Sequence, residues 1–94
     1  MMKEFDVVID TLEILRDALS AKDQDKSFEA VTVLLMQCQH VLEGEQAFFD
    51  TVFPRLDELK NRIQAGHYEH AHKTASTLLV GFRSMRKSME QPPI

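Results

Sequence analysis

Histidines are the residues of this 94-residue chain whose type and spacing come nearest to a chemical site. His67 and His70 are three residues apart and can share one face of a helix, whereas His72 points elsewhere and His40 lies far away in the sequence. A metal site on helices needs histidines four residues apart, or Glu-x-x-His pairs that converge from several helices. This spacing does not supply that geometry, so we interpret the histidines as exposed turn residues and expect no metal and no cofactor.

The other residues that could support catalysis are scattered. Cys38, the one cysteine, follows the apolar run 31–36, where a free thiol behaves as a small hydrophobic residue. The three glycines are isolated from one another, so the sequence contains no glycine-rich phosphate loop. Adjacent carboxylates lie beside expected turns, as solvated residues do, at Asp23 and Asp25, Glu43 and Glu45, and Asp57 and Glu58. The sequence therefore predicts a protein that is not an enzyme.

Charge is unevenly distributed along the chain. Residues 1–58 carry thirteen acids and five bases, a net charge of −8, and residues 59–94 carry two acids and six bases, a net charge of +4. A nucleic-acid-binding protein would show a coherent basic surface, so we expect no nucleic acid partner. Two interpretations stay open: the halves neutralise each other within the fold or across a dimer, or the acidic half recognises a basic partner.

Cysteine usage and hydropathy indicate the compartment. A single cysteine allows no intramolecular disulfide, which favours a reducing environment. We expect no secretory leader, and no stretch approaches the length of about eighteen apolar residues that a membrane span needs. We expect a cytoplasmic protein that does not interact with membranes.

Apolar residues recur with the 3.6-residue period of a helix in four segments, over residues 5–19, 28–43, 49–63 and 68–89. Turn-like residues separate these segments, and no long linker is present. We expect an all-α fold, an antiparallel bundle or hairpin stack of three to four helices. The predicted organisation is a single helical domain over residues 1–90, followed by a frayed tail at 91–94.

The second segment has ambiguous ends. Residues 21–26 are predicted to form a polar turn, with Asp25 or Ser27 as the N-cap of the helix that follows. Gly44 is expected to end that helix or to act as a swivel. A strand is the competing prediction for residues 31–36, and the helical period that continues beyond them favours a helix.

A proline interrupts the third segment. Pro54 would kink the interior of a helix, and it is tolerated in a first turn. We therefore expect either a kinked helix or a break near Asp50 and Thr51, where Thr51 could cap a helix that contains Pro54 in its first turn. Gly66 is expected to end this helix.

The turn before the last segment resembles the helical hairpin of tetratricopeptide repeats. The resemblance rests on Gly66, Tyr68 and Ala71, where the glycine lets two helices approach and the other two side chains pack between them. It covers residues 59–79, and it does not recur at the 34-residue period of that family. Small chaperones of bacterial type III secretion contain such hairpins and shield a helical partner, so the resemblance implies a chaperone-like protein.

A second resemblance concerns metal binding. The segment 40–45, with Phe-Pro at positions 53–54, is similar to the His…Glu…Phe-Pro run of hemerythrin-like four-helix bundles. This resemblance would make ligands of His40, Glu43 and Glu45. That family also needs a histidine on the first helix, which this sequence lacks, and the spacing from His40 to either glutamate differs from the family pattern.

Aromatic and methionine residues indicate a contact surface, with core filling as the alternative. The candidate partner-binding residues are Val33, Met36, Phe48, Phe49, Met85 and Met89. We predict a small adaptor or chaperone that forms a homodimer and binds a helical segment of a protein partner through apolar faces of the second and last helices. The alternatives are an acidic inhibitor or immunity-type protein that binds a basic partner surface, and a degenerate hemerythrin-like metal-binding bundle.

Overall fold

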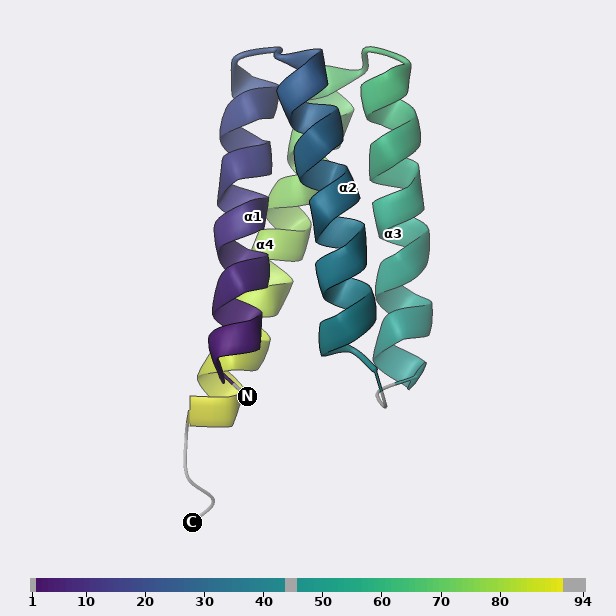
Figure 1. The fold of residues 1–94 in the computed structure, drawn as a ribbon. Helices are drawn as coiled ribbons and strands as arrows, with labels where there is room; N and C mark the ends of the chain where they lie inside the picture. The colour runs from purple at the N-terminus through teal and green to yellow at the C-terminus, as the bar shows by residue number, and fades with distance from the viewer. Residues whose placement is uncertain (1, 44–45, 91–94) are drawn as a thin grey trace.

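Four helices make up the fold. The structure, a computed structural model, describes residues 2–43 and 46–90, without the side chains of residues 2–4, 48, 89 and 90. The helices are α1 (Met2–Ser20), α2 (Gln24–Val41), α3 (Gln46–Gln64) and α4 (Tyr68–Glu90). They pack side by side in one bundle (Figure 1), so the predicted all-α bundle is confirmed. The predicted swivel at Gly44 and the predicted tail at 91–94 lie outside the described residues.

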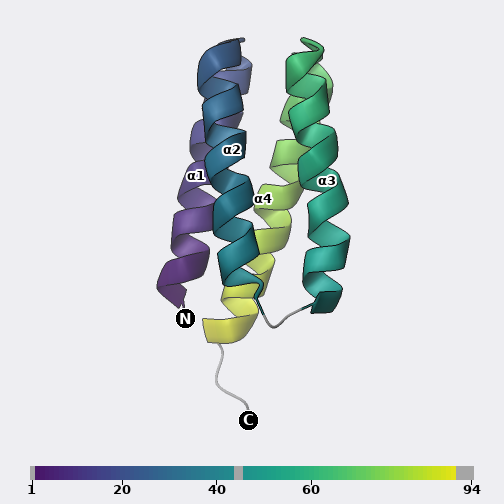
Figure 2. The ribbon, with the colours of Figure 1, turned by 45° about the vertical axis from the view of Figure 1, so that its right-hand side comes forward.

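Each helix runs antiparallel to the next one along the chain, as Figures 1 and 2 show. In the described part of the chain, α1 lies against α2 and α4, and α3 lies against the same two helices. The diagonal pairs, α1 with α3 and α2 with α4, have no Cα atoms within 8 Å of each other. The bundle therefore has four outer faces, each formed by two neighbouring helices.

Apolar stripes of all four helices meet along the bundle axis. Val8, Leu12 and Leu15 of α1 are completely buried, at the spacing that one helix face requires. Full burial of such a side chain contributes about 1.5–3 kcal/mol, so the shared core accounts for the packing of the four helices. None of the helices in residues 2–43 and 46–90 is both long enough and apolar enough to cross a membrane.

The turn between α1 and α2 is shorter than the polar segment indicates. Asp23 has an extended backbone, and its carboxylate accepts a hydrogen bond of 3.1 Å from the backbone N–H of Lys26. Asp23 is therefore the N-cap of α2, and the predictions of Asp25 and Ser27 are wrong because both lie inside the helix. The first helical turn of α2, residues 24–27, is polar and precedes the apolar stripe. In the sequence it therefore resembles the connecting segment before the helix.

Helix α3 is continuous through Pro54, so the predicted alternative of a break near Asp50 and Thr51 is wrong. Pro54 has no N–H to donate to the carbonyl of Asp50, four residues earlier. Asp50 and Pro54 are both exposed, so the missing bond lies on the solvent side of the helix. Val52 and Leu56 are buried on either side of the proline, and this packing holds the helix together across the missing bond.

A glycine in the turn from α3 to α4 terminates α3. Gly66 has a φ of +77° and donates a hydrogen bond to the carbonyl of Ile63, while the N–H of His67 donates to the carbonyl of Arg62. These two bonds form a Schellman motif, which satisfies carbonyls at the end of the helix. The Gln24 side chain of α2 also donates a bond of 3.1 Å to the Ile63 carbonyl, so this turn is tied to the neighbouring hairpin.

The turn from α1 to α2 has the equivalent hydrogen bonds, but a lysine occupies the left-handed position that a glycine occupies in the other turn. Lys22 donates to the carbonyl of Leu19, and Asp23 donates to the carbonyl of Ala18, both at 3.0 Å. Lys22 has a φ of +56°, in the left-handed region that a side chain with a Cβ adopts at a cost of about 1–2 kcal/mol. This turn therefore stores backbone strain that the glycine turn avoids.

We expect Lys22→Gly to raise the free energy of unfolding by about 1 kcal/mol, because glycine adopts this φ without strain. Urea denaturation followed by circular dichroism measures the change. The matched control is Gly66→Ala, which should lower stability by about 1 kcal/mol. A Lys22→Gly protein that is less stable than the wild type would contradict the assignment of strain to this turn.

Candidate interaction surface

Four large apolar side chains are exposed on the face formed by α1 and α2. We call them the apolar strip: Val7 (48% exposed), Ile14 (52%), Val33 (40%) and Met36 (66%). Isolated apolar residues are common on protein surfaces, whereas contiguous ones mark interaction sites. The question is therefore whether these four residues form one surface.

The antiparallel pairing of α1 and α2 brings the strip together. Ile14 and Val33 line one shallow hollow of about 240 Å³, whose other apolar residue is Ala30. Val7 lies two turns before Ile14, and Met36 lies one turn after Val33, so both extend the strip in the same direction away from the turn. The strip therefore has its centre at Ile14 and Val33, and Val7 and Met36 lie further from the turn on the same two helices.

The two hairpins, α1–α2 and α3–α4, repeat one pattern of buried residues at an offset of 44 positions. The matching buried pairs are Val8 and Val52, Leu12 and Leu56, Leu15 and Leu59, Leu19 and Ile63, Val31 and Ala75, Leu34 and Leu78, and Cys38 and Phe82. The two positive-φ residues, Lys22 and Gly66, are related by the same offset. Sequence reasoning missed this repeat, which a comparison of the chain with itself at that offset would have found.

The same offset gives a built-in comparison for the apolar strip. The counterparts of Val7, Ile14, Val33 and Met36 are Thr51, Glu58, Thr77 and Val80. Three of these four counterparts are polar, in a hairpin with the same buried pattern. Folding therefore does not require apolar residues at these outer positions, and the strip is the candidate functional site.

The structure divides the predicted partner-binding residues among several places. Val33 and Met36 belong to the apolar strip. Phe49 and Met85 are partly buried against the core, and the side chains of Phe48 and Met89 lie outside the described residues. Since α2 and α4 are diagonal in the bundle, their predicted residues do not meet on one surface.

Two residues of the strip were missed from the sequence. Val7 and Ile14 lie beside the buried stripe of α1 and are separated in the sequence by core residues and by polar residues such as Asp10. Nothing in the α1 sequence distinguishes them from isolated surface residues. Only the contact of α1 with α2 brings Ile14 into one hollow with Val33.

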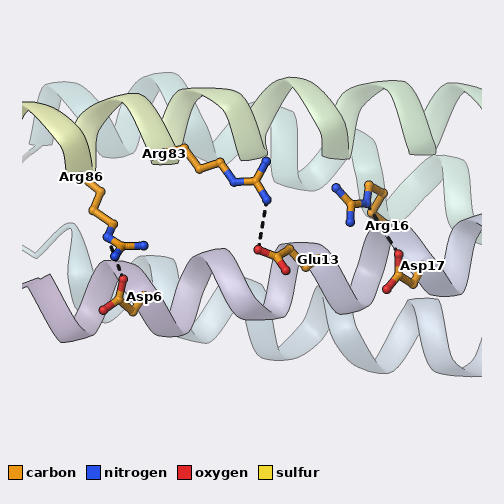
Figure 3. Close-up of polar contacts among 6 residues, drawn as sticks. All are labelled: Asp6, Glu13, Arg16, Asp17, Arg83 and Arg86. Atoms are coloured by element: carbon orange, nitrogen blue, oxygen red, sulfur yellow. Dashed lines mark hydrogen bonds and ion pairs between the residues drawn. The ribbon is translucent and has the colours of Figure 1, made fainter.

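Ion pairs connect α1 and α4 on the face that these two helices form. A guanidinium nitrogen of Arg83 lies 3.1 Å from a Glu13 carboxylate oxygen, and Arg86 Nε lies 2.9 Å from Asp6 Oδ1. Figure 3 shows both arginines of α4 reaching across to α1. The residues are half-exposed, so each pair contributes no more than about 1 kcal/mol. Part of the acidic half is therefore neutralised within the fold by the basic half.

Three acids lie near the apolar strip. Asp10 lies between the two strip residues of α1, and Asp25 and Glu29 lie one turn apart on α2. None of these three carboxylates forms an ion pair with another described residue. Lys26 is the one base among the residues that line the hollow. The borders of the strip are therefore negatively charged.

Histidines do not gather into a larger cluster in the described part of the chain. The rings of His67 and His70 lie 6.4 Å apart, and His40 Nδ1 is 4.0 Å from a Glu43 oxygen. Within residues 2–43 and 46–90, no three His, Cys, Asp or Glu residues come together at a metal-binding spacing. Glu45, the third residue of the hemerythrin-like set, lies outside the described residues.

Cys38 is completely buried in the core of the bundle. Burial penalises the thiolate and raises the pKa of the Cys38 thiol from 9.0 to about 12. A thiol that stays protonated at neutral pH is a weak nucleophile. The environment therefore suits the small hydrophobic residue that the apolar run predicts.

Comparison of the chain with protein-family models, with curated proteins and with solved structures gives no match. Function is therefore inferred from the surface of the molecule itself.

The Cys38 thiol predicts how stability depends on alkaline pH. The native state holds this proton more tightly than the unfolded chain, so its contribution to stability is complete below pH 9 and declines as the pH rises toward 12. We expect the free energy of unfolding to fall more steeply with pH in the wild type than in Cys38→Ala. Urea denaturation at a series of pH values tests this, and equal slopes would contradict the raised pKa.

Proposed function

We propose that this protein is a non-enzymatic protein–protein interaction module, an adaptor or chaperone, that binds a helical segment of a partner on the apolar strip. The observation that carries the proposal is the contrast between the hairpins. Val7, Ile14 and Val33 are exposed and apolar where the matching hairpin has polar residues. Exposed apolar residues that the fold does not need favour a role in contact.

A helix is the partner element that suits this groove. Two antiparallel helices present a straight hollow along which a third helix can lay apolar residues spaced three and four apart. Val7 and Ile14 are seven residues apart, which corresponds to about 10 Å along the helix axis. A partner helix of two to three turns would cover the strip.

Charge at the borders of the strip favours a basic partner helix. Asp10, Asp25 and Glu29 would lie beside such a helix, with Lys26 as the opposing base. Complementary charge increases the association rate and selects among partners, while apolar burial supplies most of the affinity. The alternative, an acidic inhibitor that recognises a basic surface through charge alone, uses the same carboxylates without the strip.

A synthetic amphipathic peptide tests the proposal. We expect a labelled helical peptide with leucines on one face and lysines on its flanks to bind the wild type, as measured by fluorescence anisotropy. The double variant with Ile14→Ser and Val33→Ser should weaken binding by about tenfold or more, because each substitution removes apolar contact area. Val80→Ser, which changes a valine of α4 that is 66% exposed, is the matched control.

Two further arms separate the alternatives. The same peptide with glutamates in place of lysines should bind more weakly, because the borders repel it. Raising the ionic strength should reduce lysine-peptide binding only modestly, whereas recognition through charge alone would be lost steeply. Unchanged binding by the folded double variant would refute a role for the strip.

A second copy of the chain is the other occupant that we propose for the strip, in keeping with the predicted homodimer. Two copies would bring like-charged borders together, so self-association should strengthen as salt screens the carboxylates. Light scattering at low and high ionic strength measures this, with Ile14→Glu expected to remain monomeric. A wild-type monomer at high protein concentration in both buffers would contradict the homodimer.

A further inference from the structure

A second hollow lies on the opposite hairpin, between α3 and α4. Its volume is about 330 Å³, and Leu78, Phe82 and Met85 contribute apolar surface to it. Gly81 and Arg55 are among the residues that line it. The hollow belongs to the α3–α4 face and is separate from the apolar strip on the α1–α2 face.

The packing of the helices does not explain why position 81, beside this hollow, is a glycine. A Cβ atom placed on Gly81 would meet no other atom within 4 Å, so the packing of the helices does not require a glycine here. Glycine in the interior of a helix is also less favourable than alanine. The counterpart of Gly81 in the first hairpin is Gln37, whose side chain is half-buried. The second hairpin therefore lacks a side chain where the first has one.

Arg55 gives the hollow a charge preference. Its guanidinium forms no ion pair with any other residue that the structure describes, whereas Arg62, two turns further along α3, is paired with Glu58 at 3.0 Å. The counterpart of Arg55 in the first hairpin is the uncharged Thr11. An arginine beside apolar surface recognises a carboxylate through paired, charge-assisted hydrogen bonds.

We propose that the hollow over Gly81 binds a small amphiphilic carboxylate, with its aliphatic body on Leu78 and Phe82 and its carboxylate on Arg55. At about 30 Å³ for each non-hydrogen atom, roughly the share of a water molecule, the volume corresponds to a ligand of about ten such atoms. Ligand sites typically combine an apolar floor with a few polar groups that fix orientation. This site does not depend on the function proposed for the apolar strip.

Octanoate is the probe, with octan-1-ol as the uncharged control of the same chain length. Titration into the full chain, followed by nuclear magnetic resonance of backbone amides, should give saturable shifts centred on Gly81 and Phe82. Gly81→Leu, which fills the hollow, should abolish these shifts while the protein stays folded. Arg55→Gln should weaken octanoate binding by about tenfold or more and leave octan-1-ol binding unchanged.

Several results would overturn the proposal. Octanoate that binds folded Gly81→Leu as well as it binds the wild type would show that the hollow is not the site. Equal affinity for octanoate and octan-1-ol would remove the role of Arg55. Shifts confined to Ile14 and Val33 would assign the ligand to the apolar strip. Concentration-dependent shifts at Gly81 without octanoate would show that a second copy occupies the hollow. The variant Val80→Ser, beside Gly81 on α4, should bind octanoate like the wild type.

Discussion

Burial of matched apolar stripes in one shared core is the interaction on which the rest of this molecule depends. The stripe of α1 recurs in α3 and the stripe of α2 recurs in α4, so that the same positions of each hairpin are buried. Leu12 and Leu56 are one such pair, and Leu34 and Leu78 are another. Once these positions hold the helices together, the outward positions of each hairpin can differ without loss of the shared core.

What the outward positions carry then differs from face to face. Between α1 and α2 they are apolar, at Ile14 and Val33, and form a strip with negative borders. Between α3 and α4, Gly81 leaves a hollow beside Arg55. Between α1 and α4, arginines from the basic half of the chain pair with acids of α1 (Figure 3). A single repeated core thus supports three faces of different chemistry, and two of them carry the sites that we propose for binding.

Ionic contacts also explain how the uneven charge of the chain is arranged in space. Glu13 and Asp6 are partly neutralised by the α4 arginines, which leaves Asp10 and Glu29 as charges near the strip. Part of the acid excess of the first half therefore lies near the α1–α2 face. This placement joins two interpretations of the charge, because neutralisation on one face and an acidic surface on another occur together.

Prediction from the sequence succeeded where a long periodic pattern was available. Helix α4 begins at Tyr68 as expected, since its stripe continues for more than five turns. Prediction failed at the start of α2 and at the proline of α3, where the local sequence is compatible with more than one structure. Asp23 caps α2 because it directly follows the left-handed residue Lys22 and precedes the first residue of the helix. The polar first turn of α2 hides this helix boundary in the sequence. Pro54 stays inside α3 because buried residues on both sides hold the helix, and tertiary packing of this kind leaves no local signal.

The sequence by itself determined that the chain is all helical and which residues face the core, because a 3.6-residue period specifies both the helix and its buried side. It also determined the buried Cys38, whose neighbours are apolar. The tertiary structure alone decided which outward residues become neighbours. Ile14 and Val33 come from different helices and line one hollow only through antiparallel pairing, and Gly81 lines a hollow only because α3 lies beside α4. A surface is a property of two packed helices, so no single helical pattern contains it.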